Sequence, residues 1–599
     1  MTLRQLVKRS SADQILELDI RAADDRDDHD TISLIPPPPL AFLSSKHSAN
    51  LQTSAHLTSL ESQPMSAAYR KYADLIPSIS EPEWNQLNSL VDQDPDSFDN
   101  WEKLIQATEA LEGGLGRSSS PEVIEQARRV FDAFLGKFPL LFGYWKRYAD
   151  AEFAISGSDA SELIYQRAVA SIPGSVDLWT SYCSLKMETC PDDEEVRDLF
   201  DTAADFVGLD FLSHTFWDKY IEFEERMERQ DLLIKLLERI IHIPMHQYAR
   251  YFESYTTLGA TRPIDELASE QDISDIKKSI TNADRMGKPK SHAEVEREVR
   301  TQIHKLHTKI FSKTQEETMS RWPFEAEIKR PYFHVTLIDE SELVNWRKYL
   351  DFEELEGDVE RIRFLYEKCL VATALYDEFW FRYARWTLSQ GEDLYEDVRN
   401  IYRRGSALFV PICRPAFRVA YAHFEEGTGE ISLARDIFES ELVELPGNLE
   451  ILVARANLER RVAGVDAAIQ FYKNELQSNT NDVYTKGSLV AEWSKLIWTS
   501  KGSDQEARDV FVQYKDKCLD SRYFWINYLQ FELGLPTSSE IEHERYKRIS
   551  EVHYEMRTTA RLPPTTVKDL SHTYMVYLLE RGGASAIQEY NRLDAEVNG

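Results

Sequence analysis

Few residues in this sequence have the types and spacing that metal binding requires. His242 and His246 are four residues apart, a spacing that places two zinc ligands on one face of a helix. Pro244 lies between them and the glutamate of an HExxH zinc motif is missing, so we interpret the pair as structural. His304 and His307 lie in a basic segment with no acidic or thiol partner nearby in the sequence, and we expect them at the surface.

Nucleotide-binding and catalytic motifs are incomplete or missing. Gly287-Lys288 lacks the upstream glycine and the following Ser or Thr of a phosphate-binding loop. Gly113, Gly114 and Gly116 follow a predicted helix and indicate a turn between helices. We find neither the GxSxG motif of a nucleophile elbow nor the set of kinase motifs. The sequence therefore predicts a protein that is not an enzyme, with no catalytic residue, no cofactor and no metal site.

The overall charge favours protein partners. The 599 residues carry a formal net charge of −32, and a field of that sign repels phosphate backbones. The charge therefore disfavours binding of nucleic acid across a broad surface, so we expect any RNA contact to be local or made by a partner. Basic protein segments would suit this surface. Hydrophobic residues make up 42% of the sequence and aromatic residues 11%, which is enough for a packed core.

One segment reverses this charge locally. Residues 277–313 contain ten Lys and Arg residues and four Asp and Glu residues, a net charge of +6. Such a segment could contact RNA phosphates or dock on an acidic partner, and the alternative is a solvated linker. No aromatic residue accompanies the basic ones before Phe311, which weakens a model of base stacking on single strands. The candidate binding residues are Lys277, Lys278, Arg285, Lys288, Lys290, Arg297 and Arg300.

Two alternating signatures define the elements that must position any binding surface. The second signature, on the later helix of each expected pair, is Ala-Arg-x2-aromatic, as in Ala127-Arg128 with Phe131 and Ala507-Arg508 with Phe511. The first signature, Trp-x2-Tyr-x3-Glu, occurs in four complete copies: Trp145, Tyr148 and Glu152; Trp217, Tyr220 and Glu224; Trp346, Tyr349 and Glu353; and Trp525, Tyr528 and Glu532.

The spacing of the signatures predicts an all-α solenoid of helix-turn-helix repeats in two arms. Trp and Tyr three residues apart, with Glu four residues further on, fall on one side of a helix. From Trp145 to Trp179, and from Trp346 to Trp380, the distance is 34 residues, which fits two helices and two short turns. A single hairpin cannot bury its aromatic face, so successive hairpins must stack. We therefore interpret the tryptophans as core residues and not as a ligand cage.

Cysteine usage and hydropathy indicate an intracellular compartment. The five cysteines are scattered without a CxxC pair, which is typical of reduced thiols in a cytosolic or nuclear protein. No run of about 18 apolar residues occurs, and the N-terminal segment lacks the apolar region of a signal peptide. We expect a soluble protein that is not exported.

The two signatures together resemble the HAT (half-a-tetratricopeptide) repeat, a tetratricopeptide-like unit, over residues 80–535. The resemblance implies a role in RNA processing, since HAT proteins as a group act there. It also implies that the signature glutamate faces an arginine of the neighbouring helix, which makes Glu152 and Glu353 structural.

Three longer stretches are similar to one branch of the HAT family, whose members associate with the U1 small nuclear ribonucleoprotein (U1 snRNP). These stretches are residues 208–220, 243–251 and 321–334. The similarity implies a nuclear scaffold that acts in pre-mRNA splicing at 5′ splice-site recognition by bridging U1 snRNP proteins. It also implies a dimer, with itself or with a related HAT protein, through the C-terminal repeats. The alternatives are a HAT scaffold of another complex, of the 3′-end cleavage or crooked-neck type, and a direct RNA-binding protein that uses the basic segment.

Composition and repeat positions predict five parts of the chain. The first is a disordered acidic and proline-rich tail, whose four prolines Pro36 to Pro39 could form a polyproline II ligand or an extended spacer. The last, in which the repeat signature fades while apolar helices continue, is a capping or dimerisation region. The boundaries are 1–65 for the tail, 80–257 for the N-terminal arm, 258–320 for a polar, basic insertion with a linker helix, 321–535 for the C-terminal arm and 536–599 for the last part.

Overall fold

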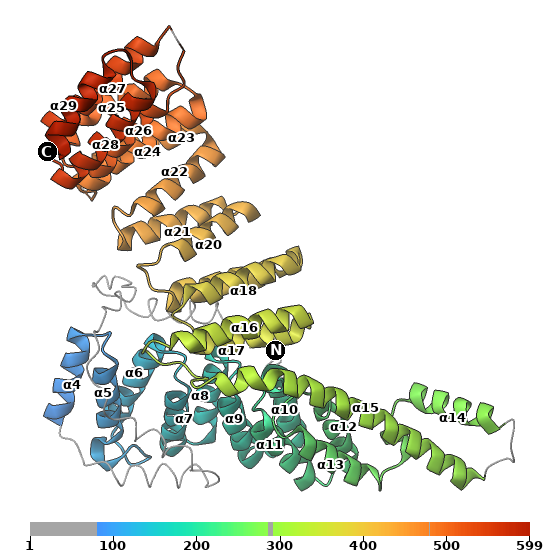
Figure 1. The fold of residues 1–599 in the computed structure, drawn as a ribbon. Helices are drawn as coiled ribbons and strands as arrows, with labels where there is room; N and C mark the ends of the chain where they lie inside the picture. The colour runs from blue at the N-terminus through green and yellow to red at the C-terminus, as the bar shows by residue number, and fades with distance from the viewer. Residues whose placement is uncertain (1–80, 285–290, 479, 539, 599) are drawn as a thin grey trace. The chain divides into compact units, whose positions relative to one another are not determined.

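The computed structural model describes residues 81–284, 291–478, 480–538 and 540–598 (Figure 1). Within these residues the chain forms 26 α-helices and no strand, so the predicted all-α fold is confirmed. No helix in this part of the chain is long and apolar enough to cross a membrane. The predicted tail at 1–65, with its prolines, lies outside the described residues.

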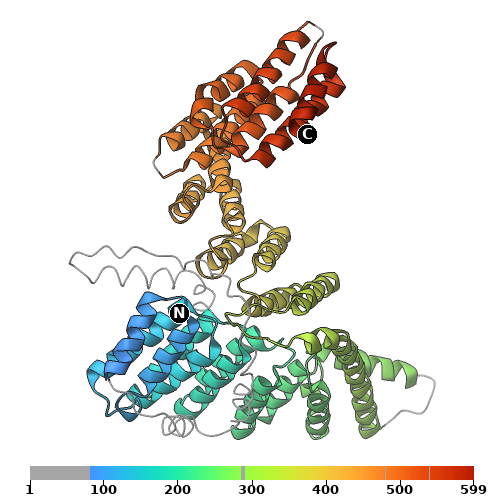
Figure 2. The ribbon, with the colours of Figure 1, turned by 60° about the vertical axis from the view of Figure 1, so that its left-hand side comes forward.

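The described chain divides into two compact units at Val410 and Pro411. In both, successive helices pack as antiparallel pairs, which Figure 2 shows from a second side. The helices of unit one are α4 (Glu81–Gln93), α5 (Phe98–Glu109), α6 (Pro121–Lys137), α7 (Phe142–Ser156), α8 (Ser158–Ser171), α9 (Val176–Thr189), α10 (Asp193–Val207), α11 (His214–Arg226), α12 (Gln230–Ile240), α13 (Tyr248–Gly259), α14 (Glu270–Asp284), α15 (His292–Glu327), α16 (Glu340–Glu356), α17 (Val359–Ala372), α18 (Asp377–Gln390) and α19 (Tyr395–Arg404).

Unit two begins at Pro411 and continues the repeat pattern. Within it, α20 packs on α21, α22 on α23 and α24 on α25. Its helices are α20 (Ala416–Thr428), α21 (Ile431–Glu444), α22 (Leu449–Ala463), α23 (Val465–Gln477), α24 (Val483–Lys501), α25 (Asp504–Tyr514), α26 (Arg522–Gly534), α27 (Glu542–Thr558), α28 (Pro564–Arg581) and α29 (Ala586–Asn598).

Several tryptophans at the first signature position share one hydrogen bond. Each indole N–H donates to the carbonyl oxygen six residues earlier, in the turn that precedes the helix, over 2.8 Å. The bond satisfies a turn carbonyl that would otherwise be buried without a partner. The ring thus fills the core while its polar edge fixes the turn. The pairs are Trp101 with Pro95, Trp145 with Pro139, Trp179 with Pro173 and Trp380 with Ala374.

The signature glutamates join consecutive repeats. The arginine of the second helix in one repeat donates two hydrogen bonds to the glutamate of the first helix in the next repeat, with the shorter bond between 2.6 and 2.8 Å. Bidentate pairing of this kind compensates the burial of a carboxylate. The pairs are Arg128 with Glu152, Arg197 with Glu224, Arg321 with Glu353, Arg435 with Glu459 and Arg508 with Glu532.

An aromatic stack accompanies most of these ion pairs. The aromatic residue three positions after the arginine lies on the same helical face and stacks on the signature tyrosine of the next repeat. The ring centroids are between 4.6 and 5.0 Å apart. Each of these four repeat interfaces is therefore specified by two side chains from each helix. The stacked pairs are Phe131 with Tyr148, Phe200 with Tyr220, Phe324 with Tyr349 and Phe511 with Tyr528.

The polar, basic insertion predicted at 258–320 is helical before its linker helix as well. It contains α14, whose Ile273 and Ile280 are buried, and α14 packs against α15. Two isoleucines seven residues apart lie on one face of a helix, so they form a narrow apolar stripe. The polar composition around them conceals this stripe.

The linker helix predicted within 258–320 is α15, which continues to Glu327 with Pro323 inside it. Its C-terminal end carries Arg321 and Phe324, an Arg-x2-aromatic signature that contacts Glu353 and Tyr349 of α16. α15 therefore also serves as the second helix of a repeat. Arg321 and Phe324 have the signature spacing, but the Trp-Pro dipeptide between them masks the match.

We expect Arg508→Ala to destabilise unit two by about 3 kcal/mol, because it leaves the buried Glu532 carboxylate without its partner. Chemical denaturation of the full-length protein measures the change. The matched control is Arg229→Ala, which breaks an exposed ion pair with Asp231 and should leave stability unchanged. Equal effects of the two substitutions would contradict a structural role for the repeat ion pair.

Candidate macromolecule-binding surfaces

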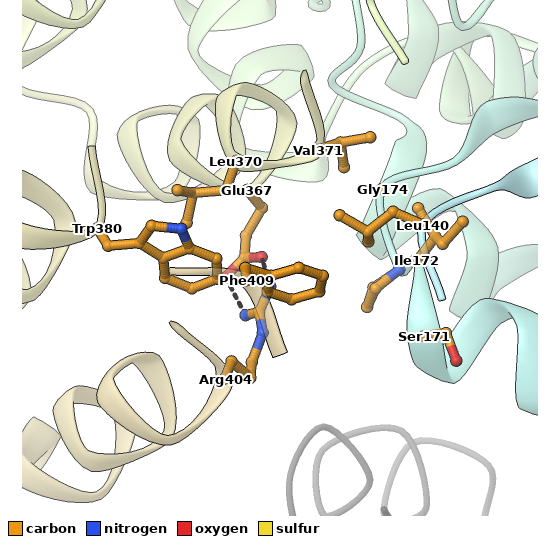
Figure 3. Close-up of a pocket in the computed structure, with 11 residues that line it drawn as sticks. Leu140, Ser171, Ile172, Gly174, Glu367, Leu370, Val371, Trp380, Arg404 and Phe409 are labelled. Carbon is orange, nitrogen blue, oxygen red and sulfur yellow. Dashed lines mark hydrogen bonds and ion pairs between the residues drawn. The ribbon is translucent and has the colours of Figure 1, made fainter. Parts of the chain in front are cut away.

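A small cavity lies in unit one between the turns that follow α6 and α8 and a second group, which comprises α17, α18, α19 and the π-helix Gly405–Phe409 (Figure 3). Leu140 and Ile172 line it from the first group, and Leu370 and Phe409 line it from the second. Its volume is about 10 Å³, which holds roughly one water molecule. The place is therefore an internal packing contact and not a site for a substrate or cofactor.

The ion pair beside this cavity is structural. Arg404 donates two hydrogen bonds to Glu367, at 2.9 and 2.8 Å (Figure 3). Burial opposes ionisation of Glu367, but the charge and hydrogen bonds of Arg404 outweigh burial, and the pKa of Glu367 is lowered. Both groups are thus charged and compensated.

Lys368 of α17 forms a second buried cluster with two carboxylates. Its Nζ lies 2.9 Å from Glu325 Oε2 and 3.1 Å from Asp210 Oδ2. Burial lowers the pKa of Lys368, but the two carboxylates raise it more, so the pKa is raised overall. The cluster connects α17 to the end of α15 and to the turn after α10.

The three stretches that resemble the U1-associated branch meet beside this cluster. Phe211 of the first stretch, His246 of the second and Trp322 of the third have ring centroids 6.0 to 6.4 Å apart. The backbone N–H of His246 also donates to the carbonyl of Phe211 over 2.8 Å. The distinguishing residues therefore join the N-terminal arm to the end of α15. His246 packs among these rings, and no group of three potential metal ligands occurs in the described part of the chain.

The segment between α15 and α16 lies along the N-terminal arm. The ring of Tyr332 lies 6.4 Å from that of Phe142 at the start of α7, and the ring of His334 lies 6.0 Å from that of Phe98 in α5. Arg330 holds the segment together, since its guanidinium donates to the carbonyl of Thr336 over 3.0 Å. This part of the arm is covered by the chain itself.

The structure separates the candidate basic residues into two groups. Lys277, Lys278 and Arg297 are exposed, and Lys278 pairs with Asp275 on its own helix at 3.0 Å. Arg300 instead donates to the carbonyl of Arg262 over 2.9 Å and to that of Gly259, and so caps the end of α13. The remaining candidates, Arg285, Lys288 and Lys290, lie outside the described residues.

The outer face of α15 carries three further basic residues of the 277–313 segment. Lys305, Lys309 and Lys313 are exposed on it. The opposite face is buried through residues such as Val299 and Ile303. The 100° turn per residue predicts this division once the buried face is known.

The expectation that His307 lies at the surface is wrong. The side chain is 6% exposed, and its Nε2 lies 3.2 Å from the hydroxyl oxygen of Tyr255 in α13. Burial, with a smaller effect of the His304 and His242 rings, lowers its pKa to about 4. His304, three residues earlier on the exposed face, lies at the surface as expected.

The repeated ion pairs, stacks and indole hydrogen bonds define an all-helical HAT-repeat protein. A family model of the PRP39 N-terminal HAT repeat matches residues 85–257, and one of the PRP39 C-terminal HAT repeat matches residues 319–461. The chain is 49% identical to pre-mRNA-processing factor 39 of Schizosaccharomyces pombe, over 87% of each chain. The chain thus belongs to the pre-mRNA-processing factor 39 family, which is non-enzymatic.

Two further comparisons are more distant. The chain is 23% identical to the U1 small nuclear ribonucleoprotein component PRP42 of Saccharomyces cerevisiae, over 55% of this chain and 61% of that protein. A crystal structure of CstF-77 matches with a TM-score of 0.45 and 12% identity, over 76% of this chain and 96% of that chain.

We expect His307→Gln to destabilise unit one less at low pH than at neutral pH. An unfolded histidine binds its proton near pH 6.5, whereas folded His307 does so near pH 4, so the fold loses stability as the pH falls through this window. Wild type should therefore lose about 2 kcal/mol of unfolding free energy from pH 7.5 to pH 5, since each pH unit corresponds to about 1.4 kcal/mol. The variant lacks this loss, so the difference in unfolding free energy between the two proteins should shrink by the same amount.

Denaturant unfolding at the two pH values measures this difference. His304→Gln, on the exposed side of the same helix, serves as the control and should leave the pH dependence nearly unchanged. A difference between His307→Gln and wild type that stays constant with pH would show that His307 is not held neutral.

Proposed function

We propose that this protein is a non-enzymatic scaffold subunit of the U1 snRNP, which acts in the nucleus in pre-mRNA splicing at 5′ splice-site recognition. The observation that carries the proposal is the 49% identity to a pre-mRNA-processing factor over 87% of both chains. The weaker similarity to a named U1 small nuclear ribonucleoprotein component supports the choice of particle.

The arrangement of side chains supports a role in bridging proteins. The aromatic and ionic signature residues are buried in contacts between repeats, and the cavity at Leu140 is too small for a ligand. What remains for function is the outer surface of the repeats, whose net negative charge suits basic protein segments.

We further propose that the region 536–599 forms a dimer, with a second copy or with a related HAT-repeat protein. Val576 and Leu579 are 52% and 53% exposed, and they lie three residues apart on one face of α28. Tyr554 and Ile587, on the neighbouring helices α27 and α29, are also exposed. Exposed apolar side chains at the end of a repeat array favour coverage by a partner.

Purification of the tagged protein from nuclear extract, followed by sequencing of the bound RNA, tests the assignment to U1. We expect salt-resistant enrichment of U1 RNA together with core proteins of the particle, because protein contacts resist salt better than phosphate contacts. Enrichment of another RNA class, for example with the 3′-end cleavage machinery, would instead assign the chain to a different HAT complex. No enrichment would contradict both assignments.

Val576→Glu combined with Leu579→Glu tests the dimer, because two charges cannot be buried in an apolar contact without a large cost. Light scattering of the purified protein should report a dimer for wild type and a monomer for the variant. Val443→Glu, at an exposed valine of α21, is the matched control and should remain dimeric. If wild type alone is a monomer and pairs only with a related HAT protein, the dimer is heterotypic. An unchanged dimer in the double variant would contradict the interface.

A further inference from the structure

The outer face of α15 carries a row of cations without intervening acidic residues. No Asp or Glu occurs between Glu298 and Glu316. The cationic residues of the row, Lys305, Lys309 and Lys313, are exposed and recur every four residues, so each is turned by about 40° from the previous one on the outer side of the helix. From Lys305 to Lys313 the row is about 12 Å long at 1.5 Å per residue.

The charges of this row are largely uncompensated. Lys313 forms a long, exposed contact of 3.5 Å with Glu317, and Lys305 and Lys309 have no ion pair among the described residues. Two carboxylates of the adjacent helix α14 bind elsewhere, since Asp275 pairs with Lys278 and Asp272 accepts a hydrogen bond from Ser269. The cations therefore face solvent.

The opposite face of α15 holds the row rigid. Thr314 donates to the carbonyl of Ile241 after α12 over 2.8 Å, and His307 packs edge-on against Tyr255 of α13. Arg321, further along the helix, is fixed by Glu353. The helix that carries the row is thus held by contacts at three positions along its length. The spacing of the lysines therefore does not depend on a partner.

We propose that this face of α15 binds the phosphate backbone of double-stranded RNA. The face between Arg297 and Lys313 has no exposed aromatic side chain, so it cannot stack bases as proteins that hold single strands do. It also has no exposed apolar residue that could anchor an acidic protein helix in the usual way. A row of cations held at fixed spacing offers contacts to phosphates alone, and duplex RNA is the nucleic acid that proteins recognise mainly through backbone and shape.

The small polar residues of the face are consistent with close approach of a backbone. Thr301, Thr308 and Ser312 donate to carbonyls of their own helix, at 2.8, 2.8 and 3.0 Å. They are short and their O–H groups are bound within the helix, so they fill little space between the long lysine side chains.

The charge of −32 on the whole chain does not cancel this local field. At physiological ionic strength the Debye length is about 8 Å, so carboxylates on distant helices are screened while phosphates in contact with the lysines are not. Binding should therefore be local, sensitive to salt and independent of base sequence.

The combined substitutions Lys305→Gln, Lys309→Gln and Lys313→Gln test the proposal. The probe is a duplex RNA of about 20 base pairs, and its fluorescence anisotropy is measured with the full chain at several salt concentrations. Loss of three phosphate contacts should weaken binding at least tenfold and reduce the slope of log K against log salt by about three. A single strand of the same length should bind more weakly than the duplex.

The matched control replaces three exposed lysines of other helices, Lys103, Lys235 and Lys348, with glutamine. It changes the net charge equally and should retain wild-type affinity. The proposal is overturned if wild type does not bind the duplex at low salt, if the single strand binds as tightly, or if both triple variants lose affinity equally. Binding of polyglutamate through these lysines, without RNA binding, would assign the face to an acidic protein instead.

This inference goes beyond the proposed scaffold role, and the two can fail separately. Binding of the duplex is measured with the isolated protein, whereas the assignment to U1 is measured in nuclear extract. Circular dichroism and thermal unfolding confirm that each triple variant is folded before binding is compared.

Discussion

The structure depends on one constraint, which is that a hairpin of two helices cannot bury its aromatic face alone. In this chain the solution is a repeated interface in which an arginine binds the signature glutamate of the next repeat and an aromatic ring stacks on the signature tyrosine. The glutamate can be buried because two charge-assisted hydrogen bonds compensate its desolvation. Because these interfaces use the same types of side chain, the outer surface is free to vary, and function must reside there.

The junction at the end of α15 is the place where this regular scheme is interrupted. Lys368 bridges Asp210 and Glu325, and Phe211, His246 and Trp322 pack beside them. These contacts involve residues that a generic repeat does not need, which explains why the stretches that carry them distinguish one branch of the family. The junction fixes how α15 and α16 follow the N-terminal arm within unit one.

α15 combines two roles because its faces are chemically different. Its buried face packs through His307 and Thr314, and its end supplies Arg321 to a repeat interface. Its outer face displays lysines to solvent on a chain that is otherwise acidic. A helix anchored in this way presents charge at fixed spacing, which a mobile basic linker does not do.

The sequence by itself determined the all-α repeat fold and its signature core, because aromatic residues at helical spacing must be buried wherever they recur, as Trp145 and Tyr148 are. Only the tertiary structure decided the roles of Arg300, His307 and the Arg321–Phe324 signature. Arg300 caps α13 and His307 meets Tyr255, so each role depends on a residue about 40 or more positions away in the sequence. Local patterns report which residues share a helical face, but the neighbour that each face meets is set by long-range packing.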